Sequence, residues 1–180
     1  MSIFDDKLAL GRSYEVQYAN WVMLKCNARI LPVYDYNGQL GDKAPKLQGI
    51  SPNASLVVPD LLVCEDGATS WVEVKYKTRA DWTRITNRLE TGIPLRLWRD
   101  YEAVQEASGL PVQLVFIHGQ EGEVRGNTIN NLRLIKRVYE GNSMSYGGMV
   151  FFPYEMLPII TTLDELSQAC LLYTSPSPRD

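Results

Sequence analysis

Two short apolar segments separated by a tight turn constrain the fold of this chain more than any other feature. The segments are Leu56–Cys64 and Ser70–Tyr76, and the tripeptide Glu65-Asp66-Gly67 between them is typical of a turn that joins antiparallel strands. Leu61–Val63 make the first segment apolar on both faces, and Val72 and Val74 flank Glu73 in the second, as in strands that are buried in a sheet. We therefore expect a buried β-hairpin.

Helices and further strands are predicted on either side of this hairpin. Apolar residues recur at three- and four-residue spacing near the N-terminus, which indicates a helix. A second amphipathic segment ends at Gly109 and Pro111, which are typical of a helix C-terminus, and Pro32 favours a strand at a sheet edge. The expected elements are helix 3–28, strand 29–36, loop 37–55, the hairpin, helix 95–108, strand 112–118, strands 131–139 and 148–152, and a turn or short helix over 153–160.

Composition places the chain among ordinary globular proteins. With 180 residues, 45% of them hydrophobic and 22% charged, it resembles neither a disordered nor a collagen-like sequence. The formal charge of −3 gives no general preference for nucleic acid or membrane. No run of apolar residues is long enough to span a bilayer, and the first residues lack the pattern of a signal peptide. We therefore expect a cytoplasmic protein that does not contact a membrane.

The last eleven residues are set apart from the rest of the chain. Residues 170–180, which read CLLYTSPSPRD, resemble the translation of a transposon-end sequencing adapter. A segment of that origin is excluded from reasoning about the fold. We expect residues 1–169 to form one domain and residues 170–180 to be a non-native tail.

Two carboxylates and an ammonium group are expected to meet on the hairpin. Glu73 and Lys75 are two residues apart, so they point to the same face of one strand, and Asp60 on the neighbouring strand can project beside them. Carboxylate oxygens suit Mg²⁺ or Mn²⁺ rather than zinc. Such an ion neutralises phosphate charge and lowers the pKa of bound water, and the lysine can orient the attacking hydroxide. The alternative is a solvent-facing pair of strands held by salt bridges.

Pro59-Asp60 followed by Glu73-Val74-Lys75, in the order α-β-β-β-α-β, resembles the PD-(D/E)XK nuclease superfamily, of the phage or prokaryotic recombination-nuclease type. The resemblance covers residues 8–118 and leaves 119–169 as a C-terminal extension. It implies an α/β restriction-endonuclease-like fold, in which a mixed central sheet is flanked by helices. It also implies hydrolysis of DNA phosphodiester bonds with Mg²⁺, or with Mn²⁺ in its place.

Individual roles follow from the same resemblance. It implies that Asp60 and Glu73 bind the metal together with the carbonyl of Val74, and that Lys75 positions the water nucleophile. Superfamily members often carry a glutamate on the first helix after a glycine. Glu15, which follows Gly11, fits that placement as a further metal-site residue, the alternative being an ordinary exposed glutamate. Polar residues facing the site from the second helix are expected at Tyr101 and Gln105, unless these only form the polar edge of an amphipathic helix.

Basic residues are concentrated just after the lysine of this motif. Residues 74–99 contain seven basic and two acidic residues, with Trp82 and Trp98 among them. Lysine and arginine can neutralise phosphates, and an exposed tryptophan can stack on an unpaired base. We expect four of the basic residues to contact nucleic acid, the alternative being a solvated loop with two core tryptophans. The four are Lys77, Arg79, Arg84 and Arg88.

The sequence thus predicts a metal-dependent deoxyribonuclease, with endonuclease and exonuclease activity not distinguished. A catalytically inactive nucleic-acid-binding or assembly protein with the same fold is the alternative, and RNA as the substrate and homo-oligomer formation are left open. His118 is the only histidine, and without a partner serine or cysteine a structural role is favoured for it.

Overall fold

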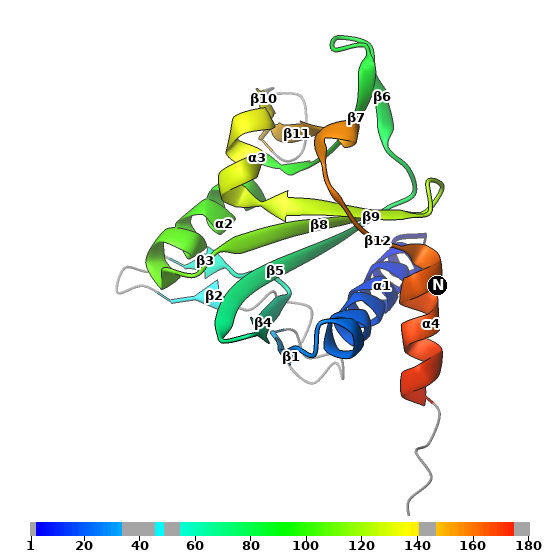
Figure 1. The fold of residues 1–180 in the computed structure, drawn as a ribbon. Coiled ribbons are helices and arrows are strands. Elements are labelled where there is room, and N and C mark those ends of the chain that lie inside the picture. Colours follow the sequence, from blue (N-terminus) through cyan, green and yellow to red (C-terminus); the bar gives the residue numbers. More distant parts are fainter. Residues whose placement is uncertain (1–2, 34–45, 49–54, 141–146, 175–180) are drawn as a thin grey trace, which may run out of the picture.

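The computed structural model describes residues 3–33, 46–48, 55–140 and 147–174 of the chain. Among these residues, seven strands follow the first helix, and helices and strands are mixed in the rest of the chain (Figure 1). The helices are α1 (Ile3–Lys25), α2 (Leu95–Ser108), α3 (Ile129–Ile135), α4 (Leu163–Thr174) and a short 3-10 helix, η1 (Tyr154–Met156). The strands are β1 (Arg29–Pro32), β2 (Lys46–Leu47), β3 (Leu56–Val57), β4 (Leu61–Glu65), β5 (Ala68–Lys77), β6 (Asp81–Thr83), β7 (Arg88–Pro94), β8 (Val112–His118), β9 (Glu123–Thr128), β10 (Arg137–Tyr139), β11 (Met149–Pro153) and β12 (Ile159–Thr162).

A mixed six-stranded sheet forms the centre of the molecule. Its strand order is β1-β4-β5-β8-β9-β12, with β5 and β8 parallel and the other neighbours antiparallel. Helices α1 and α4 pack on one face of this sheet, and α2 and α3 pack on the other (Figure 1). This arrangement confirms the predicted fold class, a mixed central sheet flanked by helices. Strands β9 and β12 lie in the segment expected to be an extension, and they belong to the central sheet.

The hairpin predicted from the turn sequence is present as β4 and β5. Leu61 pairs with Val72 and Glu65 pairs with Ala68, so the turn contains only Asp66 and Gly67. Both turn residues have positive φ, 48° and 80°, the left-handed conformation that Asp tolerates and Gly adopts freely. Strand β1 is the edge strand beside β4, as Pro32 predicted.

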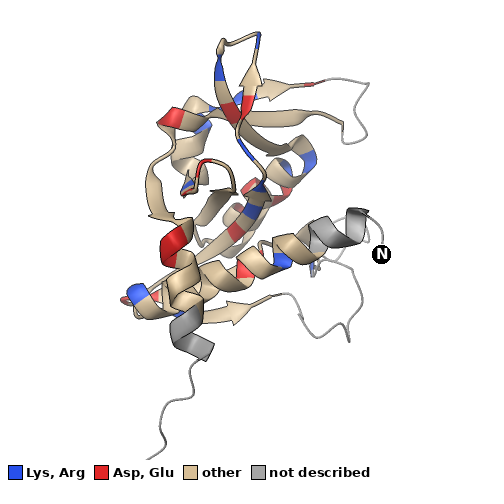
Figure 2. Cartoon of the chain, turned by 90° about the vertical axis from the view of Figure 1, so that its right-hand side faces the viewer, with Lys and Arg blue, Asp and Glu red and all other residues tan. Residues whose placement is uncertain are grey.

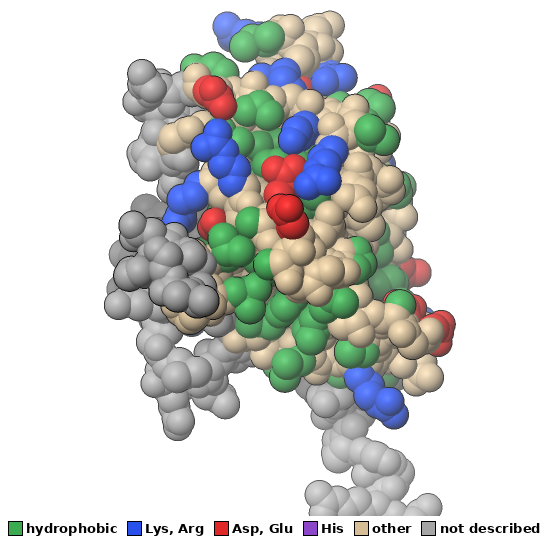
Figure 3. Space-filling view, turned by 90° about the vertical axis from the view of Figure 1, so that its left-hand side faces the viewer, with side chains coloured by type: hydrophobic (Ala, Val, Ile, Leu, Met, Phe, Trp, Pro, Cys, Tyr) green, Lys and Arg blue, Asp and Glu red, His purple; other side chains and the backbone are tan. Residues whose placement is uncertain are grey.

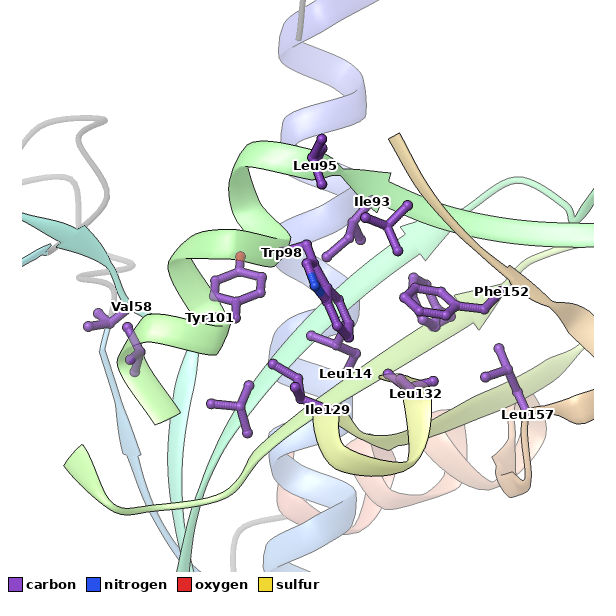
Figure 4. Packing of buried hydrophobic residues seen from close by; sticks show 14 residues of the cluster. Val58, Ile93, Leu95, Trp98, Tyr101, Leu114, Ile129, Leu132, Phe152 and Leu157 are labelled. Atoms are coloured by element: carbon purple, nitrogen blue, oxygen red, sulfur yellow. The ribbon is translucent and has the colours of Figure 1, made fainter. Parts of the chain in front are cut away.

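Two hydrophobic cores hold the helices on the sheet. On the α2 side, Trp98 is 1% exposed and packs against Phe152, with ring centroids 5.6 Å apart (Figure 4). On the other side, Tyr18 and Val22 of α1 contact side chains of β4, β5 and β8. Burying each large side chain contributes roughly 1.5–3 kcal/mol, so the two cores fix the helices relative to the sheet.

Several predicted boundaries are wrong, each for a physical reason. The segment expected as one strand over residues 56–64 divides into β3 and β4 because Pro59 has no N–H to donate to a ladder. The strand expected at 131–139 is mostly helix α3, whose first turn is capped by the Thr128 hydroxyl, which accepts a hydrogen bond from the N–H of Asn131. Only its last three residues form a strand, β10. Most of the loop expected at 37–55 lies outside the described residues, but 46–47 form β2.

Strands β6 and β7 lie in the basic segment, where the sequence pattern predicts no element. Gly92 and Pro94 disfavour a strand by their intrinsic propensity. The structure nevertheless requires glycine at 92, since a Cβ there would lie 2.3 Å from the carbonyl oxygen of Val150 on β11. Tertiary pairing therefore overrides local propensity in β7.

No described helix is both long and apolar enough to cross a membrane.

A second sheet, of order β10-β11-β7-β6, is held together by a buried carboxylate. Glu90 on β7 is 1% exposed, and it accepts a hydrogen bond of 2.6 Å from the Arg137 guanidinium on β10 and one of 3.4 Å from Arg88. Burial raises the pKa of Glu90, but the hydrogen bonds, chiefly that of Arg137, outweigh burial and lower it to about 2. Glu90 therefore stays ionised and ties β7 to β10.

Replacing Arg137 by methionine is expected to lower the free energy of unfolding by about 3 kcal/mol, because a buried carboxylate loses its main partner. The wild-type pKa of Glu90 is lower in the folded state than in the unfolded state. Its contribution to stability is therefore present above the unfolded pKa and is lost as the pH falls from about 4.5 toward about 2. Urea unfolding between pH 2 and 7 should show this loss in wild type and a much smaller one in the variant. Arg133→Met is the control, because Arg133 pairs with Glu102 at the surface. Equal effects of both variants would contradict the role of Glu90.

Candidate active site

Asp60, the residue before strand β4, contacts strand β5. The backbone N–H of Val74 donates a 2.8 Å hydrogen bond to Oδ2 of Asp60. Asp60 is 4% exposed, so this contact is shielded from water. The structure therefore places the Asp60 carboxylate beside the strand that carries Glu73 and Lys75, as their spacing predicted.

Glu73 and Lys75 form an ion pair on one face of β5, through Nζ of Lys75 and Oε1 of Glu73. The Glu73 side chain is 1% exposed and that of Lys75 is 32% exposed, so the pair connects the interior with solvent. The other carboxylate oxygen of Glu73, Oε2, is buried and has no hydrogen-bond partner among the described residues. An unpaired buried carboxylate oxygen is costly unless it binds a cation or a donor.

Helix α1 brings a third carboxylate, Glu15, into the electrostatic range of this pair. Burial raises the pKa of Glu15, the Lys75 ammonium lowers it and the Glu73 carboxylate raises it again. Tyr14 stacks on Tyr76 of β5 with ring centroids 4.4 Å apart and an interplanar angle of 5°. Since these two tyrosines adjoin Glu15 and Lys75 in sequence, their stacking fixes the helix at the level of the charged cluster.

The cluster contains more negative charge than its lysine can balance. Burial raises the pKa of Asp60 well above its ordinary value, and the charges of Glu73 and Glu15 raise it further, against the opposing effects of Lys75 and the Val74 N–H. Burial alone lowers the pKa of Lys75, but Glu73 and Asp60 outweigh it and raise that pKa, so Lys75 remains an ammonium ion. The site therefore favours an additional cation.

The donor set suits a hard divalent ion, although the carboxylates do not form a complete cage. In the described residues, no group of three or more His, Cys, Asp or Glu side chains is arranged to hold a metal ion. The chemistry nonetheless fits Mg²⁺ or Mn²⁺, because Asp60 and Glu73 supply carboxylate oxygens and Oε2 of Glu73 is unpaired. The carbonyl of Val74, the residue after Glu73, is a further oxygen donor. So is the carboxylate of Glu15, whose charge interacts with those of Glu73 and Lys75.

The predicted nucleic-acid contacts lie at different places. Arg79, Arg84 and Arg88 are exposed on or beside the β6–β7 hairpin, and Figure 2 shows Lys and Arg positions on this hairpin and at its tip. Lys77 is half-buried, and burial and the nearby Lys75 lower its pKa. These four basic residues thus follow the chain from the charged cluster out to the hairpin.

Helix α2 does not present the two polar residues expected from it. Tyr101 is 1% exposed and belongs to the hydrophobic core, so its predicted place at a nucleic-acid surface is wrong (Figure 4). Gln105 accepts a hydrogen bond from the N–H of Val112 and donates one to Asn130, which fixes α2 to the start of β8 and to α3. The register in which α2 docks on the sheet decides both outcomes.

The two tryptophans of the basic segment lie in different environments. Trp82 on β6 is 60% exposed, whereas Trp98 on α2 is buried under Lys136, whose ammonium lies 4.6 Å from the ring centroid. On the face of α2 and α3, basic side chains are interspersed with acidic ones (Figure 3), for example Arg133 and Lys136 around Glu102. That face is a network of ion pairs and offers little net positive charge.

The tyrosine pair and the buried histidine were not predicted as parts of the site or its surroundings. The available signal for the pair is that Tyr14 and Tyr76 each adjoin a predicted site residue. His118 is fully buried, and burial lowers its pKa to about 4. Its ring meets the Tyr154 ring edge-on at 4.9 Å, which places it in the packing between β8 and η1.

No protein-family model matches the sequence, and no curated protein matches it either. Among solved structures, the chain is similar to Hjc, a Holliday junction resolvase from the archaeal hyperthermophile Archaeoglobus fulgidus. That match has a TM-score of 0.45 and 11% identity over 80% of this chain and 90% of the other. The chain is also similar to D212, a nuclease from a fusselovirus, with a TM-score of 0.44 and 12% identity over 94% of this chain and 92% of the other.

Proposed function

We propose that this protein is a metal-dependent nuclease of the PD-(D/E)XK type that hydrolyses DNA phosphodiester bonds. One observation carries the proposal: two buried carboxylates, Asp60 and Glu73, lie beside one partly exposed ammonium group, that of Lys75. Buried charge in such excess is costly and is typical of sites that bind ions or perform catalysis. A surface salt bridge between two strands would need neither the burial nor the second carboxylate.

Asp60 and Glu73 would hold the metal, with Glu15 and the Val74 carbonyl as further oxygen donors. Mg²⁺ bound there would neutralise phosphate charge and lower the pKa of a coordinated water molecule. The Val74 N–H holds Asp60 by its hydrogen bond to Oδ2, and Oδ1 is the oxygen that would bind the metal. The burial of Glu73 keeps its unpaired Oε2 away from bulk water.

Lys75 is proposed to act on the reacting water and phosphate. Its side chain is partly exposed, and its ammonium group, kept charged by Glu73 and Asp60, can donate hydrogen bonds to both. In hydrolysis the water oxygen forms a bond to phosphorus and gives up a proton to solvent, while the bond from phosphorus to the leaving nucleoside oxygen breaks and that oxygen takes up a proton. A fixed ammonium beside that centre stabilises the negative charge that develops on the phosphoryl oxygens.

The experiment that tests this function is DNA cleavage by the full chain with Mg²⁺, Mn²⁺ or EDTA. We expect cleavage of at least one of single-stranded, duplex and branched DNA with either ion, none in EDTA, and recovery when Mg²⁺ is restored. Parallel RNA substrates determine whether DNA is the preferred polymer. Inactivity on every DNA with both ions would contradict the proposal.

A catalytically inactive DNA-binding protein with the same fold is the second candidate. It is favoured by one observation, namely that no three metal-ligating side chains of the described residues are arranged around one point. Calorimetric titration of wild type with Mg²⁺ and Mn²⁺ separates the two candidates, since the inactive protein would bind neither ion while it still bound DNA.

Glu15→Gln is expected to lower the cleavage rate by about tenfold, because an auxiliary carboxylate assists the metal without being its main ligand. The substitution keeps the shape of the side chain and removes one negative charge near Lys75 and Glu73. Rates should be compared over a range of Mg²⁺ concentrations, and a higher Mg²⁺ requirement is expected. Gln17→Glu, two residues further along α1, is the control. An unchanged Mg²⁺ requirement in Glu15→Gln would remove Glu15 from the site.

A further inference from the structure

The β6–β7 hairpin extends beyond the sheet that anchors it. Strand β11 pairs with β7 only from Pro94 to Glu90, so Leu89 and Arg88 pair with β6 alone. Beyond the last pair, between Thr83 and Arg88, a four-residue turn closes the hairpin, with Asn87 at φ 52°. Figure 1 shows this two-stranded end projecting from the molecule.

The projecting end carries apolar side chains that contribute little to a core. Trp82 is 60% exposed and Ile85, in the turn, is 81% exposed. A two-stranded ribbon gains little stability from apolar side chains that remain in water, and proteins rarely present a tryptophan in this way without a partner. The hairpin end is therefore suited to contact another molecule.

Charge identifies the chemistry of that molecule. Arg79 and Arg84 are exposed and flank Trp82 along the chain, and the one exposed acid on these strands, Asp81, lies 3.9 Å from Arg79. Arg88 is also exposed, but Trp82 pairs with Leu89 and Arg88 pairs with Thr83, so Arg88 lies on the other face of the hairpin. Guanidinium groups bind phosphates, while an indole stacks on a base only where that base is unpaired. An arginine-flanked aromatic platform thus matches a nucleic acid whose bases are accessible, and it does not match the closed stack of a duplex.

The base of the hairpin is rigid enough to hold this platform at a fixed place. Glu90, buried at the point where the hairpin leaves the sheet, binds Arg137 of β10 and Arg88 of the hairpin. Only three residues, 78–80, connect β5 to β6, and Ala80 donates its N–H to Glu121 at 3.0 Å. The chain therefore runs directly from Lys75 to Trp82 through anchored backbone.

We propose that the end of the β6–β7 hairpin binds unpaired bases, so that the substrate class is DNA containing an unpaired strand. The arginines beside Trp82 hold the phosphate backbone, and Trp82 stacks on an unpaired base. This inference rests on the proposed function for the cleavage step, but the binding preference itself is independent of catalysis.

The test measures binding of the full chain in EDTA, where no cleavage occurs. A forked DNA with unpaired arms, a blunt duplex of the same paired sequence and a single strand are compared by fluorescence anisotropy. We expect wild type to prefer the fork to the duplex, and Trp82→Ala to weaken fork binding by about tenfold, the value of one stacked base, while duplex binding changes less than about twofold. Trp82→Phe, which keeps an aromatic face, should retain most of the preference.

Matched variants separate stacking from charge and from general surface effects. Arg84→Gln should weaken binding to fork and duplex alike and reduce the salt dependence by about one ion. Leu134→Ala removes an apolar side chain that is 84% exposed on α3, far along the chain from the hairpin, and should change neither affinity. Thermal melting of each variant checks that it is folded.

The inference is overturned by equal affinity of wild type for fork and duplex, or by equal loss on both substrates in Trp82→Ala. It is also overturned if Trp82→Ala changes the oligomeric state in gel filtration without altering the fork preference, since the hairpin would then join two copies of the chain. A fork preference that depends on Trp82 in a protein that cuts no DNA would support this inference and reject the nuclease. Cleavage of DNA by a protein that shows no fork preference would support the nuclease and reject this inference.

Discussion

Lys75→Met is expected to reduce Mg²⁺-dependent DNA cleavage by about a thousandfold or more, the cost of removing a charged donor aimed at the reacting centre. Methionine keeps the length and the apolar stem of the side chain, so the variant loses the ammonium group and little packing. The expected effect lies in the maximal rate and not in DNA affinity, because we propose that the arginines of the hairpin supply the binding. Single-turnover cleavage assays and anisotropy titrations measure the two separately.

The same substitution also removes the positive partner of Glu73 found among the described residues. In the absence of metal the variant should unfold at a lower temperature than wild type, since a buried carboxylate is left without compensation. Lys25→Met, at the exposed end of α1, controls for the loss of a lysine and should behave as wild type. Retention of more than about a tenth of the wild-type rate in Lys75→Met would show that Lys75 does not act in the chemical step.

Local turn chemistry explains why the hairpin of β4 and β5 could be predicted from sequence. The preference of Asp66-Gly67 for positive φ acts within four residues, and the alternation of Glu73 and Lys75 requires nothing beyond strand geometry. Strand β7 could not be predicted in this way. Gly92 and Pro94 are poor strand residues, and they form a strand because β11, more than fifty residues later, pairs with them.

The difference between local and tertiary determinants also applies to the candidate site. Asp60 lies beside Val74 because a hairpin brings neighbouring strands together. Glu73 pairs with Lys75 because residues two apart on one strand point to the same face. The orientation of Tyr101 depends on how the whole of α2 docks on the sheet, and a shift of one residue would exchange its buried and exposed positions. The stacking of Tyr14 on Tyr76 likewise joins residues that only the tertiary fold brings together. The roles assigned to these residues in catalysis remain predictions.

Asp60→Asn is expected to have opposite effects on metal binding and on metal-free stability. Loss of a hydrogen-bonding partner around a ligand already costs about 10- to 100-fold in metal affinity, so loss of a ligand's own charge should cost about a hundredfold or more. Cleavage should fall accordingly. The asparagine oxygen can still accept the Val74 N–H, so the local backbone is expected to keep its structure. Calorimetric titration with Mn²⁺ measures the affinity, with Asp164→Asn, an exposed carboxylate on α4, as the control.

Without metal, the Asp60→Asn variant should be more stable than wild type at neutral pH, by about 1 kcal/mol. Burial and the charges of Glu73 and Glu15 raise the pKa of Asp60 in the folded state. The contribution of Asp60 to wild-type stability in EDTA is therefore greatest below the unfolded pKa of an aspartate, and it is lost as the pH rises through the raised folded value. The variant lacks this loss, so the two unfolding curves should converge at acidic pH and separate toward neutrality. A variant less stable than wild type at pH 7 in EDTA would mean that Asp60 stabilises the metal-free fold as a hydrogen-bond partner of Val74. It would contradict the proposal that the charge of Asp60 needs a bound cation.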